Sequence, residues 1–347
     1  MSKKIDVAVV GASGLVGGEL LGLLEARKFP VGRFLPFNSG RTAAFVAFKG
    51  KKHLCRKPVF SELKKADLVF FVSTDEVSGR FAKKLAGSGV WCIDDSSRFR
   101  LDKNVPLVIP EVNAAALESG GRLIAGPNCT LTGAAVALHG IHKKFKILEL
   151  RIATYQAVSG AGKGALKQLE AELLYYFKHG RVPELKGRKF PRAIAFNLFP
   201  QVGGFDGNGT SVEEAKVSAE LKKIWTSPGL RISSTAVRVP VLRGHSLSVW
   251  ARTSRPWTLA SLRAALAATP GLQFFGNPYK YPTPLDVVKT SGVKAGRLRA
   301  AETSPKEFQL WIVSDNLYKG AALNSVEIAE YLLDRGLLVA PARVRVF

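Results

Sequence analysis

Cys129 is the residue whose type and setting point most directly to chemistry. It follows a short apolar run at 123–125 and precedes a stretch of helical character at 133–142. A thiol that caps a helix N-terminus meets free backbone N–H groups and the positive end of the helix dipole, and both favour the thiolate. A thiolate is a nucleophile, so this position predicts covalent catalysis through a thioester. A buried core cysteine is the alternative, because free thiols are among the most buried side chains.

A glycine-rich loop at 11–17 is the second chemical signal. It follows an apolar run at 5–10 and opens a stretch with helical periodicity at 15–25. Glycine permits a tight turn and close approach of the backbone, and the helix N-terminus receives a pyrophosphate. A plain strand-to-helix turn is the alternative, but this context favours a dinucleotide. The contacts expected from the loop lie at Gly11, Ser13, Gly14, Leu15 and Val16.

The stretch at 36–42 distinguishes NADP from NAD. An acidic residue after the second strand of such a fold would bind the ribose 2′-hydroxyl. This stretch has no carboxylate, but it offers hydroxyls and a guanidinium at Ser39, Arg41 and Thr42. The pattern favours the 2′-phosphate of NADP, whereas an ordinary solvated loop arginine is the alternative for Arg41.

The pattern of apolar residues changes near residue 130. Up to residue 130, short apolar runs at 67–72, 90–93, 107–109 and 122–125 alternate with helical patterns, which predicts βαβ units and a parallel sheet. Beyond it, longer runs rich in β-branched residues predict a mixed or antiparallel sheet. We expect these strands at 148–158, 232–241, 246–251 and 308–314, a loop at 179–191, and a final helix at 321–333 that packs back on the first domain.

Length and composition describe a globular protein of two domains. The chain has 347 residues, of which 46% are hydrophobic and 22% charged. No apolar run reaches the roughly 18 residues that a membrane span needs. The N-terminus enters a strand pattern directly, so we expect no signal peptide. The three cysteines provide no disulfide framework, which favours a reducing, cytoplasmic setting.

The charge is strongly basic, with 51 Lys and Arg against 27 Asp and Glu, a net +24. The basic residues are scattered as short pairs such as Lys51-Lys52 and Lys222-Lys223, without a basic tail. This scattering argues against specific nucleic-acid binding, which uses a basic stripe or arm. A basic surface can instead steer anionic ligands towards a local pocket.

Nearly the whole chain resembles aspartate-semialdehyde dehydrogenases, in segments that follow one another in the same order. The segments are GASGLVG at 11–17, NSGRT at 38–42, DDSSRFR at 94–100, VPLVIPEVN at 105–113, GPNCT at 126–130, TYQAVSGAGKGA at 154–165, AFN at 195–197, EEAK at 213–216, VRVPVLRGHS at 237–246, YPTPLD at 281–286 and SDNLYKGAALNSVEIAE at 314–330.

The resemblance implies an α/β chain with an N-terminal Rossmann-type NADP-binding domain and an α+β catalytic and dimerisation domain built on a mixed sheet. We place the first at 1–127 plus 317–347 and the second at 128–316. The implied reaction is the NADPH-dependent reductive dephosphorylation of L-aspartyl-4-phosphate, which gives aspartate semialdehyde and phosphate on the route to lysine, threonine, methionine and diaminopimelate. A homodimer or a tetramer is implied as the assembly, and no metal is expected.

The resemblance also assigns catalytic roles. Cys129 matches the nucleophile, and His245 matches an acid/base that takes the thiol proton and serves later proton transfers. Gln156 matches the glutamine that orients the substrate carbonyl. Without the resemblance, His245 reads as a structural histidine and Gln156 as a hydrogen-bonded amide at a strand end.

The charged groups of the substrate have matching residues as well. Arg238 matches the arginine that holds the α-carboxylate in a bidentate pair, and its spacing from His245 lets both reach one cleft. Glu213 matches the carboxylate that binds the α-ammonium. Lys216, three positions on and on the same helical face, matches a phosphate contact. A routine surface ion pair is the alternative for these two. The remaining phosphate ligands match Arg100 and Asn128, and the nicotinamide surroundings match Ser159, Gly160 and Asn316.

The chain departs from the family after the strand that ends at Ser73, a further expected cofactor contact. Small residues are common there, but this chain has Thr74-Asp75-Glu76, and carboxylates facing a pyrophosphate would repel it. Two related functions compete with the dehydrogenase. One is a non-catalytic paralogue, which retention of Cys129 and Arg238 argues against. The other is an N-acetyl-glutamyl-phosphate reductase, against which Glu213 favours a free ammonium.

Overall fold

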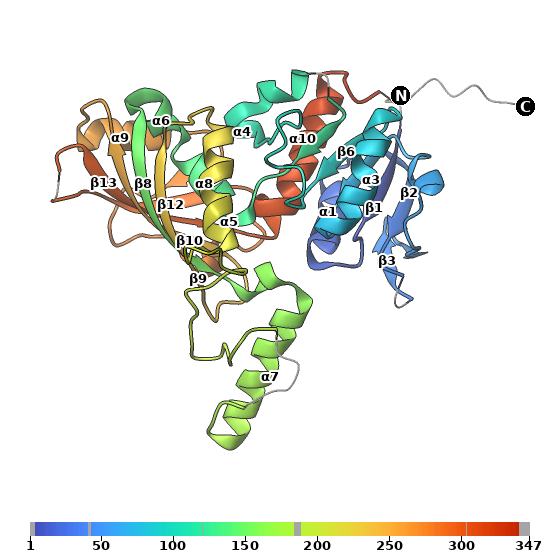
Figure 1. Cartoon of the computed structure of the whole chain (residues 1–347), viewed down its shortest axis with the longest axis horizontal. Coiled ribbons are helices and arrows are strands. Elements are labelled where there is room, and N and C mark those ends of the chain that lie inside the picture. Colours follow the sequence, from blue (N-terminus) through green and yellow to red (C-terminus); the bar gives the residue numbers. More distant parts are fainter. Residues whose placement is uncertain (1–3, 41–42, 120, 184–188, 303, 340–347) are drawn as a thin grey trace, which may run out of the picture. The chain divides into compact units, whose positions relative to one another are not determined.

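The computed structural model describes residues 4–40, 43–119, 121–183, 189–302 and 304–339 (Figure 1). Contacts between Cα atoms divide the chain into two compact units. The first consists of Met1–Pro127 with Ala321–Phe347, and the second is Asn128–Gly320. Each unit has its own sheet.

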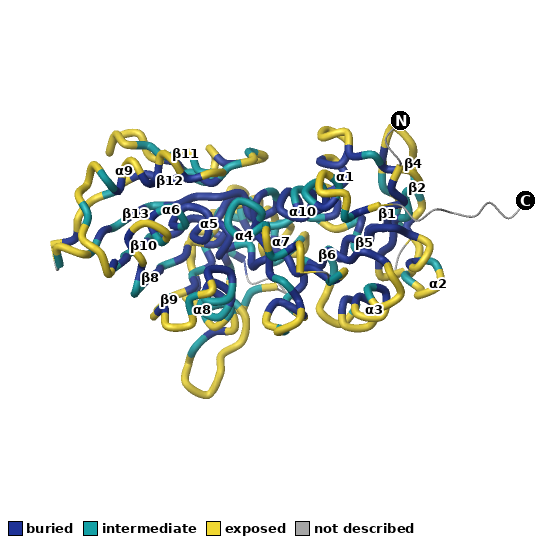
Figure 2. The backbone as a smooth tube through the Cα atoms, turned by 90° about the horizontal axis from the view of Figure 1, so that it is seen from above, coloured by how far each residue is buried: buried dark blue, intermediate teal, exposed yellow. Residues whose placement is uncertain are grey.

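The first unit is built on a five-stranded parallel sheet in the order β2-β1-β5-β6-β7. Its central strands are buried along their whole length, as strands covered on both faces are; Figure 2 shows them dark blue. The strands are β1 (Ile5–Val10), β2 (Val31–Phe37), β5 (Leu68–Phe71), β6 (Trp91–Asp94) and β7 (Leu123–Ala125). An antiparallel hairpin, β3 (Phe45–Phe48) and β4 (Lys51–Leu54), stands apart from this sheet. The βαβ pattern expected for the first part of the chain is confirmed.

One apolar run expected in this sheet forms no strand. At 107–109 only Leu107 makes a bridge, to Ala125. The side chain of Asn113 forms the hydrogen bonds that a neighbouring strand would otherwise provide. Its Oδ1 accepts from the N–H of Ile109 and its Nδ2 donates to the carbonyl of Leu107, both at 2.9 Å. Pro110 then begins a helical turn.

The helices of the first unit include α1, which opens directly after the glycine loop. The others are α2 (Phe60–Leu63), α3 (Asp75–Gly87), α4 (Pro110–Asn113), the 3₁₀-helix η1 (Ala114–Ser119) and α10 (Leu323–Asp334), with α1 at Leu15–Ala26. α10 packs on α1, and the ion pair between Arg27 and Glu330 joins the two at 2.6 Å. The final helix therefore returns to the first domain, as its amphipathic pattern predicts.

The second unit contains a six-stranded mixed sheet in the order β11-β12-β13-β10-β8-β9. β8 runs parallel to β9 and antiparallel to β10, so the carboxyl ends of β8 and β9 lie beside the start of β10. This topology carries Gln156, Arg238 and His245 to one end of the sheet. The strands are β8 (Ile147–Gln156), β9 (Arg231–Arg238), β10 (His245–Thr253), β11 (Leu272–Phe274), β12 (Val293–Ala300) and β13 (Glu307–Ser314). The mixed sheet is as expected, although β9 ends before Pro240.

The helices of this unit begin with α5, which starts at Cys129. The expected helix at 133–142 is two helices, α5 (Cys129–Ala137) and α6 (His139–Phe145), separated at Leu138. α7 (Lys163–His179) was not expected; it extends away from the sheet and packs on the 3₁₀-helix η2 at Val158–Ala161 (Figure 1). The remaining helices are α8 (Val212–Ile224), α9 (Leu259–Ala267) and the 3₁₀-helix η3 (Pro284–Val287). The π-helix η4 (Tyr318–Ala322) begins in this unit and ends in the first.

Candidate active site

Asn128 and Cys129 together form the start of α5. Asn128 is the N-cap, and its Oδ1 accepts from the backbone N–H groups of Thr130 at 2.8 Å and Leu131 at 3.3 Å. The prediction that the thiol itself caps this helix is therefore wrong, because an amide oxygen satisfies the first N–H groups better than sulfur does. Cys129 is instead the first residue of the helix, where the dipole still favours an anion.

Cys129 differs from the other two cysteines in its exposure. Cys55 and Cys92 are buried, and burial raises the pKa of both thiols. Cys129 is only partly buried. The least buried of the three cysteines is thus the one at the helix start.

The imidazole of His245 faces this sulfur. His245 opens β10, pairs with Ser314 of β13 and has no exposed surface. Its Nε2 lies 3.5 Å from the Cys129 Sγ, and its Nδ1 accepts from the backbone N–H of Ala157 at 3.1 Å. A neutral ring that accepts at Nδ1 carries its proton on Nε2. The ring is then a donor towards sulfur, and taking up the thiol proton would require Nδ1 to give up its bond with Ala157.

The protonation of His245 gives a testable expectation. Burial and the nearby Arg238 guanidinium lower the pKa of His245 well below its usual 6.5. Since the pKa is lowered, we expect the ring to be neutral at pH 6.5 and above and to gain a proton only at a pH well below that value. Nitrogen-15 NMR of the ring, assigned by the loss of its signals in His245→Asn, measures both the titration and the protonated nitrogen. A midpoint near 6.5, or a proton on Nδ1, would contradict this structure.

The backbone of Ala157 holds two functional side chains at once. Its N–H binds His245, and its carbonyl accepts from Nη1 of Arg238 at 2.6 Å. Arg238 ends β9 and is 5% exposed. Beside both lies Gly160, where an added Cβ would sit 3.0 Å from the Arg238 Nη1 and 3.3 Å from the His245 ring. The expectation that Arg238 and His245 reach one place is confirmed, and Gly160 leaves space there.

Glu213 of α8 binds three neutral side chains around the cysteine. One carboxylate oxygen accepts from the Thr130 hydroxyl at 3.0 Å and from the Gln156 Nε2 at 2.7 Å, and the other from the Asn128 Nδ2 at 3.0 Å. The alternative of a surface ion pair with Lys216 is therefore wrong, and within the described residues Lys216 has no ion-pair partner. A carboxylate accepts about four hydrogen bonds, so Glu213 retains room for a ligand donor.

Gln156 presents an acceptor to the site. Its Nε2 bonds to Thr130 and Glu213, whereas its buried Oε1 has no hydrogen-bond partner. An unpaired buried polar atom costs free energy, of the order of 1–3 kcal/mol, which a bound ligand recovers. The predicted role is to orient the substrate carbonyl, and donation to that carbonyl requires Nε2 to leave Thr130 or Glu213 first.

The residues expected around the nicotinamide lie beside His245. The Asn316 Nδ2 donates to the Ser159 hydroxyl at 3.0 Å, and the Asn316 Oδ1 accepts from the backbone N–H of Gly244 at 2.9 Å. Ser159 and Gly160 both belong to η2. Most of the residues expected in the substrate and nicotinamide sites lie in the second unit. They are Asn128, Cys129, Gln156, Ser159, Gly160, Glu213, Lys216, Arg238, His245 and Asn316.

The glycine loop of the first unit fits a dinucleotide. Gly11 has φ +97°, and a Cβ there would lie 2.3 Å from the Val72 carbonyl oxygen, so only glycine fits. Gly14 is the N-cap of α1 without a side-chain cap, and the first turn has no acidic residue, which suits a phosphate. The turn follows β1 at the point where strand order reverses towards β5, where such sheets bind ligands. There the buried hydroxyl of Ser73 has no partner.

The other expected cofactor and phosphate contacts of this unit are placed less closely. Ser39 is exposed after β2, and Arg41 and Thr42 lie outside the described residues. Asp75, the departure from the family pattern, is exposed and accepts from the backbone N–H of Ser97 at 2.7 Å and from its hydroxyl at 2.6 Å. Arg100 is buried and donates to the Asp95 carbonyl at 2.7 Å; its phosphate role stays a prediction.

Sequence reasoning did not identify three residues that build the site. Thr130 bonds Glu213, Ala157 orients two side chains, and Glu220 accepts from the backbone N–H of Asn128 at 2.7 Å while 1% exposed. Ala157 carries no side-chain signal at all. Glu220 could have been noticed as a carboxylate seven residues after Glu213, on the same face of one helix.

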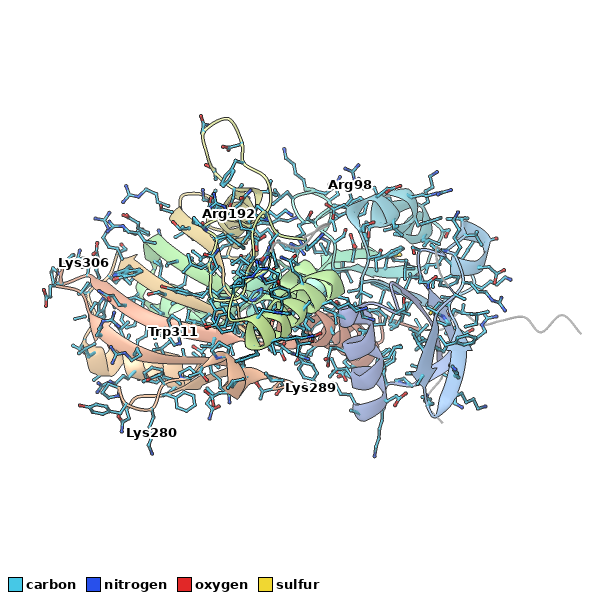
Figure 3. All side chains as sticks on the ribbon, turned by 90° about the horizontal axis from the view of Figure 1, so that it is seen from below. Arg98, Arg192, Lys280, Lys289, Lys306 and Trp311 are labelled. Atoms are coloured by element: carbon cyan, nitrogen blue, oxygen red, sulfur yellow. The ribbon has the colours of Figure 1, made fainter. Side chains whose placement is uncertain are left out.

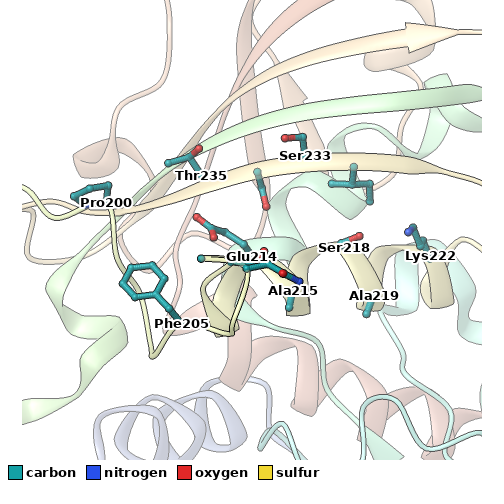
Figure 4. Close-up of a pocket in the computed structure, with 14 residues that line it drawn as sticks. Pro200, Phe205, Glu214, Ala215, Ser218, Ala219, Lys222, Ser233 and Thr235 are labelled. Carbon is teal, nitrogen blue, oxygen red and sulfur yellow. The ribbon is translucent and has the colours of Figure 1, made fainter.

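A cavity of about 750 Å³ lies elsewhere in the second unit, between α8 and β9 (Figure 4). Residues that line it include Phe205, Glu214, Ser218, Lys222 and Thr235. The carboxylate of Glu214 is already used by the backbone N–H groups of Ser211 and Ala236. None of the expected site residues lines this cavity.

The described residues offer neither a metal site nor a membrane-spanning helix. No group of three His, Cys, Asp or Glu among them could hold a metal ion, and no described helix is long and apolar enough to cross a membrane. The exposed basic side chains Arg192, Lys280 and Lys306 lie on separate segments of the second unit (Figure 3).

Known proteins match nearly the whole chain. A family model for the semialdehyde dehydrogenase NAD binding domain matches residues 6–120, and one for the dimerisation domain matches residues 138–319. The aspartate-semialdehyde dehydrogenase of Shewanella violacea is 39% identical over 337 residues, covering 96% of this chain and 99% of the relative. That of Bacillus subtilis is 38% identical over 340 residues, covering 96% and 98%. The crystal structure of aspartate semialdehyde dehydrogenase II from Vibrio cholerae has a TM-score of 0.91 at 34% identity, covering 96% and 99%.

Proposed function

The chain belongs to the aspartate-semialdehyde dehydrogenase family, and we propose that Cys129 carries the aspartyl thioester of the family reaction. That reaction is the reductive dephosphorylation of L-aspartyl-4-phosphate to L-aspartate-4-semialdehyde and phosphate, a step in the biosynthesis of the aspartate-derived amino acids. The observation that carries the proposal is the 3.5 Å contact between the Cys129 Sγ and the His245 Nε2 at the start of α5.

The thiolate performs the acyl transfer. The Cys129 Sγ attacks the acyl carbon, the C–S bond forms, and phosphate leaves with the electrons of the C–O bond. With its proton on Nε2, the tautomer that the Ala157 bond favours, His245 donates towards the sulfur and would stabilise the thiolate before attack and again when the C–S bond breaks. When bound, NADPH supplies the hydride that reduces the thioester carbon. Release of the aldehyde then restores the thiolate.

The charged groups of the substrate meet complementary side chains. Arg238 is buried and rigidly held through Ala157, which suits bidentate binding of the α-carboxylate. Glu213 offers its remaining acceptor capacity, and Gln156 its free Oε1, to the α-ammonium. The Lys216 ammonium and the second Nδ2 hydrogen of Asn128 remain for the phosphate. When the substrate ammonium binds Glu213, it would displace the Gln156 Nε2 from that carboxylate. The amide could then donate to the substrate carbonyl.

The cofactor is assigned to the glycine loop of the first unit. The backbone of Gly11–Val16 receives the pyrophosphate, Ser73 offers its unpaired hydroxyl, and Ser39, Arg41 and Thr42 receive the 2′-phosphate of NADP. Asp75 is engaged with Ser97, which supports cofactor binding despite the two carboxylates at 75–76. The dimerisation-domain match supports a homodimer, and the biosynthetic role supports a cytoplasmic location.

A reverse-direction assay tests this function. With aspartate semialdehyde, phosphate and NADP, we expect reduction of NADP that depends on phosphate, because only phosphate releases the acyl group from Cys129 as aspartyl phosphate. NAD in parallel should give a much lower rate, since it lacks the 2′-phosphate. The absorbance of the reduced cofactor is the measurement.

The same assay contains its controls. Omission of phosphate should leave at most one turnover per subunit, the burst of thioester formation. N-acetyl-glutamate semialdehyde, the substrate of the competing reductase, should be oxidised poorly because it has no free ammonium for Glu213. Faster turnover of that substrate, or turnover without phosphate, would overturn the proposed function.

A further inference from the structure

We propose that Asp315 is a positioning residue that fixes the separation of the Cys129 sulfur and the His245 ring, acting through Arg243 on one side and Gly320 on the other. The proposal rests on the proposed function, in which this pair of side chains does the chemistry. Asp315 follows β13 directly and has no exposed surface. It touches neither catalytic side chain itself in any contact that the structure shows.

The histidine side of this arrangement is the turn that leads into β10. Nε of Arg243 donates to both carboxylate oxygens of Asp315, at 2.9 and 2.8 Å. Nη2 of Arg243 lies 2.7 Å from Oδ2, in ion-pair contact but not aligned for a hydrogen bond. Arg243 is two residues before His245, and the intervening Gly244, at φ +93°, has no room for a side chain against Pro284. The carboxylate therefore anchors a short, rigid segment that ends in the imidazole.

The cysteine side is the turn that follows β13. The side-chain Oδ1 of Asp315 accepts from the backbone N–H groups of Leu317 at 3.0 Å and Tyr318 at 3.2 Å. The backbone carbonyl of Asp315 accepts from the backbone N–H of Gly320 at 2.9 Å. Gly320 packs so closely on Cys129 that an added Cβ would lie 3.0 Å from the Cys129 Cβ and 3.0 Å from its carbonyl oxygen. The backbone at Gly320 thus packs directly against Cys129, and the hydrogen bonds of Asp315 to residues 317–320 fix the position of this backbone.

A neutral side chain would not do the same work. Four donors converge on this carboxylate: Nε of Arg243 and the backbone N–H groups of Leu317, Tyr318 and Lys289, the last at 2.7 Å from Oδ2. The bond from Gly320 goes to the backbone carbonyl of Asp315, which an amide variant keeps. An amide in this place has one acceptor oxygen, and its NH₂ group would face the Lys289 N–H or the Arg243 guanidinium, which are both donors. Buried charge-assisted hydrogen bonds are stronger than neutral ones, so the carboxylate holds both turns where an amide releases one.

The first test is Asp315→Asn in the full-length enzyme, assayed with aspartate semialdehyde, phosphate and NADP. We expect kcat to fall about 10- to 100-fold, since small displacements of reacting groups cost rates of this size. KM for semialdehyde and for NADP should stay within about threefold, because Arg238, Glu213 and the glycine loop are untouched. Glu149→Gln is the matched control, a carboxylate paired with Arg151 and Arg231 at the opposite end of β8 and β9 from the site, and its kcat should not change.

A double-mutant cycle with His245→Ala separates positioning from general destabilisation. If Asp315 acts through the pair of catalytic side chains, Asp315→Asn adds little once His245 is gone, and the double variant turns over within about threefold of His245→Ala alone. Multiplicative losses would overturn the proposal, as would an unchanged kcat in Asp315→Asn. Normal turnover by His245→Ala would instead refute the proposed function.

A gentler variant covers the case in which Asp315→Asn does not fold. Arg243→Lys keeps the charge but replaces a planar fork by a single ammonium, which cannot hold both oxygens in one orientation. We expect a roughly 3- to 10-fold lower kcat, an unchanged KM, and the same loss of effect in the His245→Ala background. A kcat equal to that of the wild type in a folded Arg243→Lys enzyme would contradict the positioning role.

Discussion

Cys129→Ala is expected to lower phosphate-dependent oxidation of aspartate semialdehyde by about 10⁴-fold or more, the range seen when the nucleophile of a covalent mechanism is removed. Alanine retains the helix start and its Asn128 cap, so the protein should fold and bind NADP as before. What it removes is the sulfur that forms the thioester in the proposed reaction. The measurement is NADP reduction, together with cofactor binding by fluorescence.

Cys92→Ala is the matched control for this variant. Cys92 is a fully buried thiol of β6, and burial raises its pKa, so it takes no part in thiol chemistry at neutral pH. We expect its loss to lower the melting temperature slightly and to leave kcat unchanged. Iodoacetamide should label one thiol quickly in the wild type and in Cys92→Ala, but not in Cys129→Ala. Ordinary turnover by Cys129→Ala would refute the thioester.

Arg238→Met is expected to lower kcat/KM for aspartate semialdehyde by about 10²- to 10³-fold, which corresponds to the roughly 2–5 kcal/mol that loss of one partner of a buried charge pair costs. The guanidinium binds the α-carboxylate in the proposed site, and it lies beside His245. Removing this like charge should also raise the pKa of His245 relative to the wild type, since Arg238 is one of the two causes of its low value.

A truncated substrate checks that the loss arises at the carboxylate. The wild-type enzyme should use 3-aminopropanal, which lacks that group, far less well than aspartate semialdehyde. The Arg238→Met variant should discriminate little between the two, because the partner of the carboxylate is gone. Arg238→Lys keeps the charge without the planar fork. Its discrimination between the two substrates is expected to lie between those of the wild type and Arg238→Met. Equal discrimination by wild type and Arg238→Met would show that Arg238 does not bind the carboxylate.

Local patterns predicted the elements whose signals are strong within a short window. The strand at 5–10 and the helix that starts at Leu15 are found where the alternation of apolar residues and the glycine loop indicate them. The helix α7 was not predicted, although Leu166, Leu169 and Leu173 recur at helical spacing and pack in a core cluster of the second unit. The start of α5 was misplaced because Asn128 and Cys129 are both polar enough to precede a helix, and only the hydrogen bonds show which of them caps it.

The sequence predicted which residues form the candidate site, but not the hydrogen bonds between them. Glu213 and Lys216 lie three positions apart, and spacing alone suggested an ion pair. Long-range folding instead brings Thr130, Gln156 and Asn128 to the Glu213 carboxylate, over sequence separations of 83, 57 and 85 residues. Such contacts depend on how β8 and α8 pack around α5, and no local window contains that information. The protonated nitrogen of His245 was equally hidden, since it is set by the backbone of Ala157.

That backbone contact has an evolutionary consequence. An N–H and a carbonyl are present in every residue type except proline, which lacks the N–H. The alignment of His245 with Arg238 therefore does not depend on which side chain the genetic code places at position 157, provided that it is small enough for a fully buried site. The alignment thus rests on the path of the backbone between β8 and η2, and a variant at position 157 that keeps this path leaves both hydrogen bonds in place.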